Sequence, residues 1–415
     1  MTHRPDTSAS AEPGEPSRHA RALLDIAALL GTDGFPEELL TTSSGVLAYM
    51  DAAPGQPRLP RLTDRLRHRL RRRADAGAVR SALAELRALG QVADDGSGTV
   101  LVHESARQRV SAALTGEACA RAVATVAEAL HEYWLDAPTG AAPGLAADPS
   151  APTADERADA DRTMLACTAA LAESAGDTLL ERNTDLLFAA GHRMRESPQY
   201  SVEQEVEFWQ RLQAGCERVS GADSEDAFGA REQLGGALLT RGRQWAETAA
   251  RHYDALLADR SRARPPGDEE LLATRANRGE ALARAGRAEE AAADLEAALV
   301  EAADQGVQWP ATAHLRSRLA LAHRLAGDPD AALALRREEV ETAQESYGRA
   351  SGQALYARLD LARELRDADL PDEAAEAFRE LRDDCGELRQ PADPLRRRLF
   401  DEAQTALEEL EHGAG

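Results

Sequence analysis

LATRANRGEAL, at residues 272–282, is the most informative stretch of this 415-residue sequence. Its small and apolar residues recur every three or four positions, which predicts one face of an α-helix: Leu272, Ala276, Gly279, Leu282 and Ala283. Gly286 predicts the end of that helix, because glycine readily takes the left-handed conformation found after a helix C-terminus. A second helix is expected to follow, with an apolar face made of Ala291, Leu295, Ala298 and Leu299. The small Gly279 and Ala291 predict close packing of the two helices.

This helix pair recurs along the second half of the chain. The equivalents of Gly279, Gly286 and Ala291 are Ala320, Gly327 and Ala332, then Ala362, Asp369 and Ala374, and upstream Gly235 and Gly242 begin a similar pair. The steps of 44, 41 and 42 residues exceed the unit of about 34 residues of a tetratricopeptide repeat (TPR), so longer helices or loops are expected. Each pair can bury its apolar face only against its neighbours. We therefore predict a mostly α chain with a TPR-type right-handed α-solenoid over residues 154–412, closed by a capping helix.

Such a solenoid offers a curved groove lined by the first helix of each pair. The polar residues that we predict to line this groove and bind a partner are Arg231, Arg275, Asn277, Arg316, Arg318, Arg358 and Asp360. Arginines also occur on helix faces that only contact solvent. The alternative is therefore that these residues bind nothing.

The first half of the chain predicts a different domain. Residues 1–18 are polar and rich in proline, serine and glutamate, as in a disordered tail. Over residues 19–135, helices are followed by two short strands, Gln91–Ala93 and Thr99–Val102, around a turn at Asp94-Asp95-Gly96. Helices followed by a β-hairpin predict a small winged-helix-like domain. Residues 136–153 are rich in proline, glycine and alanine and predict a linker.

The segment RLTDRLRHRLRRR (Arg61–Arg73) contains seven arginines and raises the alternative of a DNA-binding winged helix. Its leucines, Leu62, Leu66 and Leu70, form an apolar stripe, as expected of a helix that simply packs by this face. The chain has a formal net charge of -23. Because phosphates are repelled by such a charge, we expect nucleic-acid binding to be the less favoured reading.

Other features of the sequence argue against chemistry and against membranes. All 49 basic residues are arginine, and aromatic residues make up only 4%. No metalloprotease, hydrolase or paired cysteine–histidine motif is present, so neither a catalytic set nor a metal site is predicted. The four isolated cysteines are expected to be buried thiols in a reducing cytoplasm: Cys119, Cys167, Cys216 and Cys385. We expect a cytoplasmic protein with no signal peptide and no membrane span.

Several segments, in the same order, resemble one family. They are ALLDIAALLGTDGFPEELLT (22–41), TVLVHE (99–104), AEALHEYW (127–134), LLFAAGHRM (186–194), FWQRL (208–212) and ERVSGADSEDAFGAREQL (217–234). These segments resemble the actinobacterial NB-ARC/TPR proteins, which are STAND-type signal-transduction ATPases. The resemblance implies a winged helix followed by TPRs that sense signals and bind partners. It also implies that His103, which matches the histidine after the last strand, contacts a nucleotide phosphate.

The chain departs from this family in one important way. A P-loop requires G-x-x-x-x-G-K-[ST], in which lysine reaches the phosphates, and this sequence contains no lysine. We therefore expect no cofactor in this chain, and expect His103 to contact nucleotide only if a separate NB-ARC ATPase docks on it. His103 is otherwise an ordinary histidine beside a strand.

The sequence thus favours a non-catalytic interaction protein that uses the TPR groove to bind a protein or peptide in bacterial signalling. Two alternatives remain open. The first is a transcriptional regulator that contacts DNA through the winged helix. The second is the effector half of a split STAND protein, whose ATPase is a separate chain.

Overall fold

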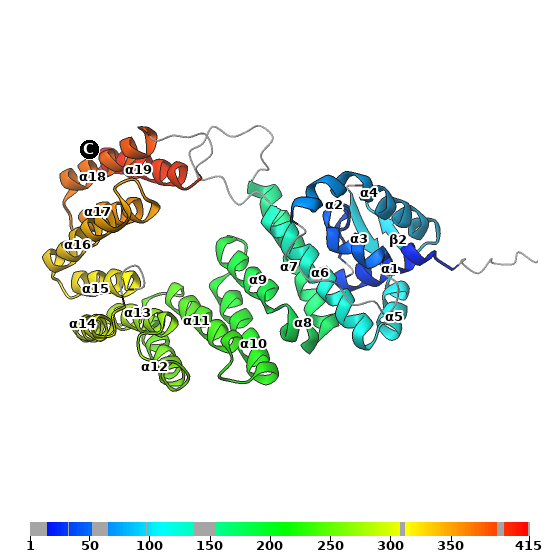
Figure 1. Ribbon diagram of the computed structural model, residues 1–415, viewed down its shortest axis with the longest axis horizontal. Coiled ribbons are helices and arrows are strands. Elements are labelled where there is room, and N and C mark those ends of the chain that lie inside the picture. Colours follow the sequence, from blue (N-terminus) through cyan, green and yellow to red (C-terminus); the bar gives the residue numbers. More distant parts are fainter. Residues whose placement is uncertain are drawn as a thin grey trace, which may run out of the picture. The chain divides into compact units, whose positions relative to one another are not determined.

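The computed structural model describes residues 15–31, 33–51, 65–96, 98–136, 154–307, 312–387 and 394–413, and Figure 1 shows its ribbon. Contacts divide the chain into two compact units, and the boundary between them falls after Tyr200. Most of the predicted tail and linker lies outside the described residues. The same holds for residues 61–64 of the arginine-rich segment.

The first unit consists of helices around a small sheet. Its elements are α1 (Arg18–Ala27), the 3-10 helix η1 (Ala28–Leu30), β1 (Phe35–Pro36), α2 (Glu37–Thr42), α3 (Ser44–Asp51), α4 (Arg65–Ala88), β2 (Val92–Asp94), β3 (Thr99–Val102), α5 (Glu104–Ala113), α6 (Gly116–Asp136), α7 (Ala154–Ala175), α8 (Asp177–Arg182) and α9 (Thr184–Glu196). Helix α1 begins at the N-cap Ser17, whose hydroxyl accepts a hydrogen bond from the Ala20 amide. Its buried Leu23 and Ile26 form part of the core of this unit.

The sheet of the first unit is antiparallel with strand order β1-β3-β2. The predicted β-hairpin is confirmed as β2 and β3, with Val92 opposite Val102. Strand β1 was not expected, since only the two strands of the hairpin were predicted in this domain. The buried Phe35 pairs with Val100 instead. Two residues are too few to show the alternating pattern by which strands are recognised.

Helices α7, α8 and α9 belong to the first unit, although the sequence analysis placed residues 154–196 at the start of the solenoid. Helix α7 packs on η1, β1 and α6. Gly31, at φ +94°, has no side chain, and a Cβ built there would lie 2.9 Å from the Cβ of Ala170. The buried Cys167 thiol also contacts the carbonyl oxygen of Gly34 at 3.9 Å. These tight contacts assign α7 to the first core.

The second unit contains the helices of the predicted repeats. They are α10 (Val202–Ser220), α11 (Glu225–Thr240), the 3-10 helix η2 (Arg243–Trp245), α12 (Ala246–Ala263), α13 (Glu269–Arg284), α14 (Ala288–Asp304), α15 (Ala313–Leu325), α16 (Pro329–Tyr347), α17 (Gly352–Asp367), α18 (Pro371–Glu387) and α19 (Pro394–Gly413). Each packs on the next along the chain, and α13 also packs on α15. The prediction of a mostly α chain with a TPR-type solenoid is confirmed.

The helices of the repeats form four hairpins. We call α11, α13, α15 and α17 the A helices, and α12, α14, α16 and α18 the B helices. In Figure 1 the A helices lie on the inner side of the arc that this unit follows, and the B helices lie on the outer side. Helix α10 precedes the hairpins by packing on α11, and α19 follows them by packing on α18 and α17.

The turns inside the hairpins match the sequence pattern. Gly286 and Gly327 follow their A helices with φ values of +89° and +87°. Asp369 takes the same place with φ +59°, and among the described residues it is the one non-glycine residue with positive φ. Gly279 lies where the hairpin is tightest, because a Cβ built on it would lie 2.7 Å from Leu295 Cδ1. Both features agree with the expectation of small residues at fixed places in each repeat.

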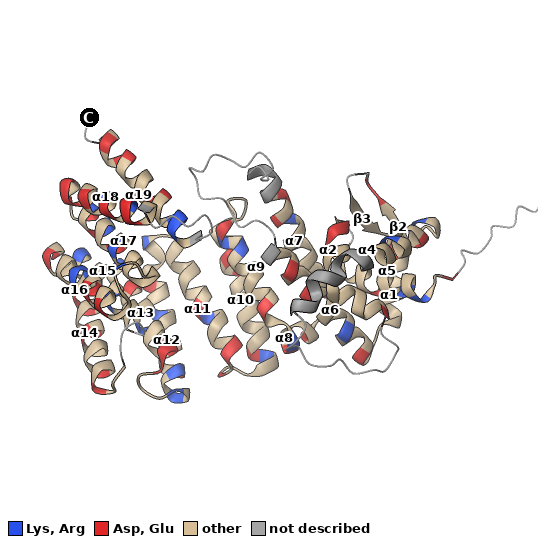
Figure 2. Ribbon diagram, turned by 45° about the horizontal axis from the view of Figure 1, so that its top comes forward, with Lys and Arg blue, Asp and Glu red and all other residues tan. Residues whose placement is uncertain are grey.

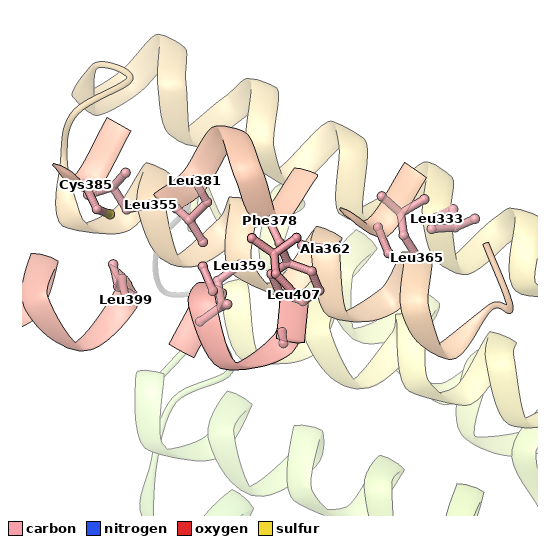
Figure 3. Packing of buried hydrophobic residues seen from close by; sticks show 13 residues of the cluster. Leu333, Leu355, Leu359, Ala362, Leu365, Phe378, Leu381, Cys385, Leu399 and Leu407 are labelled. Atoms are coloured by element: carbon pink, nitrogen blue, oxygen red, sulfur yellow. The ribbon is translucent and has the colours of Figure 1, made fainter. Parts of the chain in front are cut away.

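The core of the last hairpin and the capping helix is apolar. Figure 3 shows its buried residues, which come from α16 to α19 and include Leu333, Leu355, Leu359, Phe378, Leu381, Leu399 and Leu407. The capping helix packs on this core by one apolar stripe, in which Leu399, Ala403 and Leu407 are buried. Within the described part of the chain, no helix combines the length and hydropathy that crossing a bilayer requires.

Candidate partner-binding surface of the repeats

The repeats share one reference position, the small residue of each A helix that faces its own B helix. It is Gly235, Gly279, Ala320 and Ala362 in turn. Four of the seven predicted groove residues lie four positions before it: Arg231, Arg275, Arg316 and Arg358. At 100° per residue, such a position lies on nearly the same side of the helix as the small residue. These arginines are therefore directed towards the B helix.

The first two of these arginines pair with their own B helices. Arg231 Nη1 lies 2.7 Å from Asp259 Oδ2 on α12, and Arg231 is buried. Its carbonyl oxygen is also 2.7 Å from His252 Nε2 on the same helix. Arg275 Nη1 lies 2.5 Å from Glu301 Oε2 on α14. Both guanidinium groups thus hold the two helices of a hairpin together.

The third and fourth hairpins repeat this arrangement. Arg316 Nη1 lies 2.9 Å from Glu338 Oε1 on α16. Arg358, which is buried, places Nη1 2.5 Å from Asp384 Oδ2 on α18. The Arg358 and Arg349 guanidinium groups also lower the pKa of the Asp384 carboxyl, against the opposing effect of its burial. One arginine in each hairpin therefore forms an ion pair within the fold.

The other three predicted residues lie on a different side of the A helices. Asn277, Arg318 and Asp360 are each two positions before the small residue. The positions six before, one after and five after the small residue lie on the same side of the helix as these three. All of these positions are rotated by roughly 100–160° about the helix axis from the small residue. We call this side the open face. Because this angle is measured from the side that packs on the B helix, the open face is turned away from the B helices.

The polar residues of the open face connect neighbouring hairpins. Asn277 Nδ2 donates to Glu232 Oε1 on α11 at 2.6 Å. Arg318 Nε lies 2.9 Å from Glu280 Oε2 on α13. Asp360 Oδ2 lies 3.9 Å from Arg336 Nη1 on α16, and its Oδ1 accepts from Arg363 Nη1 within α17 at 3.1 Å. The structure thus brings three of the seven predicted residues together on one surface.

Three residues of the open face were not predicted. Leu325 on α15 is 46% exposed and Tyr356 on α17 is 42% exposed. His314 is also exposed, and it occupies the position in α15 that Tyr356 occupies in α17. The helical spacing could have placed all three on this face. Leu325 was missed because leucine was assigned to the core, and His314 and Tyr356 were missed because only the positions two and four before the small residue were taken to line the groove.

A cavity of about 500 Å³ lies between α12, α13 and α14. Its lining is apolar at Leu257, Leu271 and Leu272 and carries both signs of charge elsewhere. The arginines in it are paired: Arg275 with Glu301, and Arg278 Nη1 with Asp294 Oδ2 at 2.9 Å. This cavity is formed by the outer helices and the far side of α13, so it is separate from the open face.

Two clusters of buried polar residues lie between the hairpins. In the first, Glu232 on α11 accepts from Asn277 and Thr274 on α13 and from Arg260 on α12, at 2.6, 3.0 and 2.8 Å. Burial raises the pKa of the Glu232 carboxyl, although these donors act in the opposite direction. Because removing any partner would leave a buried group unsatisfied, this cluster fixes how α11 and α13 pack.

The second cluster lies in the third hairpin around Arg336. This residue follows Ala332 by four positions, where Leu295 and Phe378 occupy the apolar core in the second and fourth hairpins. Arg336 is buried, and its Nη1 lies 2.9 Å from Glu339 Oε2. Its Nε lies 3.7 Å from Glu364 Oε2 on α17. The third hairpin therefore has a charged group in place of an apolar one.

The remaining predicted sites are in the first unit. His103 is exposed and precedes α5, where its carbonyl oxygen accepts from the amides of Ala106 and Arg107. Residues 65–73 of the arginine-rich segment form the start of α4. Among the described residues, no group of histidine, cysteine and carboxylate side chains is arranged to hold a metal ion.

No protein-family model and no curated protein matches this chain. Two similar solved structures are of TPR-like repeats of a putative kinesin light chain from Podosopora anserina, one of them a point variant. Each is 17% identical, with TM-scores of 0.41 and 0.40, and they cover 50% and 52% of this chain and 97% and 98% of their own. At these scores the likeness carries no argument about function, and the assignment of TPR-type hairpins depends on the contacts described above.

Proposed function

We propose that this protein is a non-catalytic scaffold whose repeats bind a protein partner on the open face, in bacterial signalling or regulation. The observation that carries the proposal is the exposure of Leu325 and Tyr356 on two adjacent A helices. Large apolar side chains, and tyrosine in particular, supply much of the energy of protein interfaces. By contrast, four of the predicted arginines pair with their own B helices and hold each hairpin together: Arg231, Arg275, Arg316 and Arg358.

The proposal is tested by identifying a partner and then removing its anchors. Affinity purification of the tagged full chain with mass spectrometry names candidates, and calorimetry measures binding of each purified candidate. We expect Leu325→Ser combined with Tyr356→Ser to weaken binding about tenfold or more. Val300→Ser is the matched control, because Val300 is 62% exposed but lies on the outer helix α14.

Circular dichroism of both variants checks that they fold like the wild-type chain. Loss of binding in the Val300 variant, with binding unchanged in the double variant, would move the site to the outer helices and contradict the proposal. Unchanged binding after deletion of residues 226–412 would remove the repeats from the interaction altogether.

A second candidate function is duplex DNA binding by the first unit. It is favoured by the order of elements, in which α1, β1, α2, α3 and α4 precede the β2–β3 hairpin, as in a winged helix. In addition, α4 begins within the arginine-rich segment. The test is binding of a labelled duplex at increasing salt, which should fall steeply if phosphates are contacted. Binding that persists after replacement of Arg71, Arg72 and Arg73 by serine would contradict this candidate.

A third candidate, docking of a separate NB-ARC ATPase, is supported only by the exposure of His103. Mixing the chain with a free-standing NB-ARC protein should then slow nucleotide release from that protein. The effect should disappear with His103→Ala. Equal release rates with and without this chain would reject the candidate.

A further inference from the structure

We infer that the segment bound by the open face is an uncharged part of a protein that is anchored by large apolar side chains. This inference rests on the proposed function and names the chemistry of its partner. The net charge of -23 would by itself favour basic partners, but it is not concentrated on the open face.

The charges on the open face are already neutralised by one another. Glu280 Oε1 accepts from Arg284 at 2.7 Å, and Glu280 Oε2 lies 2.9 Å from Arg318. Arg363 bonds both Asp360 and Glu402 of the capping helix. A charged partner would have to compete with these pairs, so it would gain only the difference between two ion pairs of similar strength.

The excess of negative charge is carried by the outer helices instead. Exposed carboxylates such as Glu289, Glu341 and Glu376 lie on α14, α16 and α18. Figure 2 shows acidic residues along these helices. Because salt screens charges separated by more than about 8 Å at physiological ionic strength, carboxylates on the outer helices contribute little to binding on the open face.

What the open face offers without compensation is apolar surface. Leu325 and Tyr356 are exposed there. Leu321 on α15 is partly exposed and lies one turn before Leu325 on the same face. The positions that correspond to Tyr356 are Gly229 in α11 and Ala273 in α13. The N-terminal half of the face therefore lets a bound chain approach closely, while the C-terminal half supplies its anchors.

The test is selection of a phage-displayed library of random dodecapeptides on the immobilised full chain. We expect the enriched peptides to contain at least two large aliphatic or aromatic residues and to have net charge near zero. Their dissociation constants should change less than about twofold between roughly 0.05 and 0.5 M NaCl. They should rise about tenfold in the Leu325→Ser/Tyr356→Ser variant and stay within about twofold in Val300→Ser.

The failures of the two proposals are distinguishable. Enrichment of acidic or basic peptides, with affinity falling more than about tenfold over the same salt range, would overturn this inference and leave the scaffold proposal standing. Apolar peptides that bind the double variant as tightly as the wild-type chain would also overturn it. No enrichment over an unrelated helical protein would contradict the scaffold proposal itself.

Discussion

Arg336 is the residue at which the repeats depart most from their own pattern. A guanidinium group occupies an apolar core position, between Glu339 and Glu364, and all three residues are buried. Burial raises the pKa of both carboxyl groups, against the lowering effect of Arg336 on Glu339 and of Arg324 and Arg336 on Glu364. Buried ion pairs of this kind add little net stability but are costly to break.

We expect Arg336→Leu to lower the free energy of unfolding by about 3 kcal/mol at pH 8, because the buried Glu339 loses its partner and the buried Glu364 is left with Arg324 alone, 2.9 Å away. The loss should be smaller at pH 5, since carboxyl groups with raised pKa values take up protons in the folded state as the pH falls. Urea denaturation at the two pH values measures this. The control is Arg337→Leu, whose side chain is 58% exposed. Equal effects of the two substitutions would contradict the role assigned to Arg336.

Asp25 in α1 provides a pH-dependent test of the first unit. Burial raises the pKa of its carboxyl from 3.8 to about 6, and Arg21 opposes this only in part. A raised pKa in the folded state gives stability that is present below the unfolded value and is lost as the pH rises through the folded value. Stability of the first unit should therefore fall between about pH 4 and pH 6.

We expect Asp25→Asn to raise the free energy of unfolding of that unit at pH 8 by about 1 kcal/mol. The full shift would correspond to about 3 kcal/mol, but the carboxylate is still partly hydrated, which reduces its effect. At pH 3.5 the two proteins should unfold at the same urea concentration. A variant that is less stable than the wild-type chain at pH 8 would show that the Asp25 carboxylate is stabilising.

At the scale of elements, the hairpin turns were predictable and the roles of the arginines were not. Gly286, Gly327 and Asp369 were placed correctly, because a helix end with positive φ restricts the residue type. The spacing showed that the positions of Arg275 and Asn277 are polar in each repeat, but not which of them faces the B helix. The side of α13 that faces the B helix is identified by the close packing of Gly279 against Leu295, which the sequence does not show.

Two further elements could not be predicted for different physical reasons. Strand β1 is two residues long, so pairing of Phe35 with Val100 decides its conformation. Helices α7–α9 have the composition of any amphipathic helix, and tertiary contacts such as that of Ala170 with Gly31 assign them to the first unit. Helical spacing places Leu325 on the open face, but whether a leucine there is buried depends on tertiary contacts that the spacing does not show.

Asp369 gives a test of the hairpin turns. A residue with a Cβ in the left-handed conformation costs about 1 kcal/mol relative to glycine, and Asp369 has φ +59°. We expect Asp369→Gly to raise the free energy of unfolding by about 0.5–1 kcal/mol, partly offset by the greater chain entropy of glycine. Gly327→Ala, the matched change in the preceding turn, should lower it by about 1 kcal/mol. Denaturant midpoints of the two variants that shift in the same direction would contradict this account.

At the scale of the whole molecule, the second unit combines a charged interior framework with an uncompensated apolar surface. Ion pairs at Arg231, Arg275, Arg316 and Arg358 hold each hairpin, and polar bonds such as Asn277–Glu232 join successive hairpins. These contacts use most of the side chains that the sequence offered as a binding site. The surface left for a partner is the open face of the A helices, with Leu325 and Tyr356 on it.

The most direct test of this account is hydrogen–deuterium exchange of the full chain with and without a partner identified by affinity purification. Protection on binding should appear in peptides from Ala313–Leu325 and Gly352–Asp367, the A helices α15 and α17. Peptides from the outer helix α14 should exchange at the same rate in both states. Protection confined to α12, α14 and α16, or to α4 and the β2–β3 hairpin, would contradict binding on the open face.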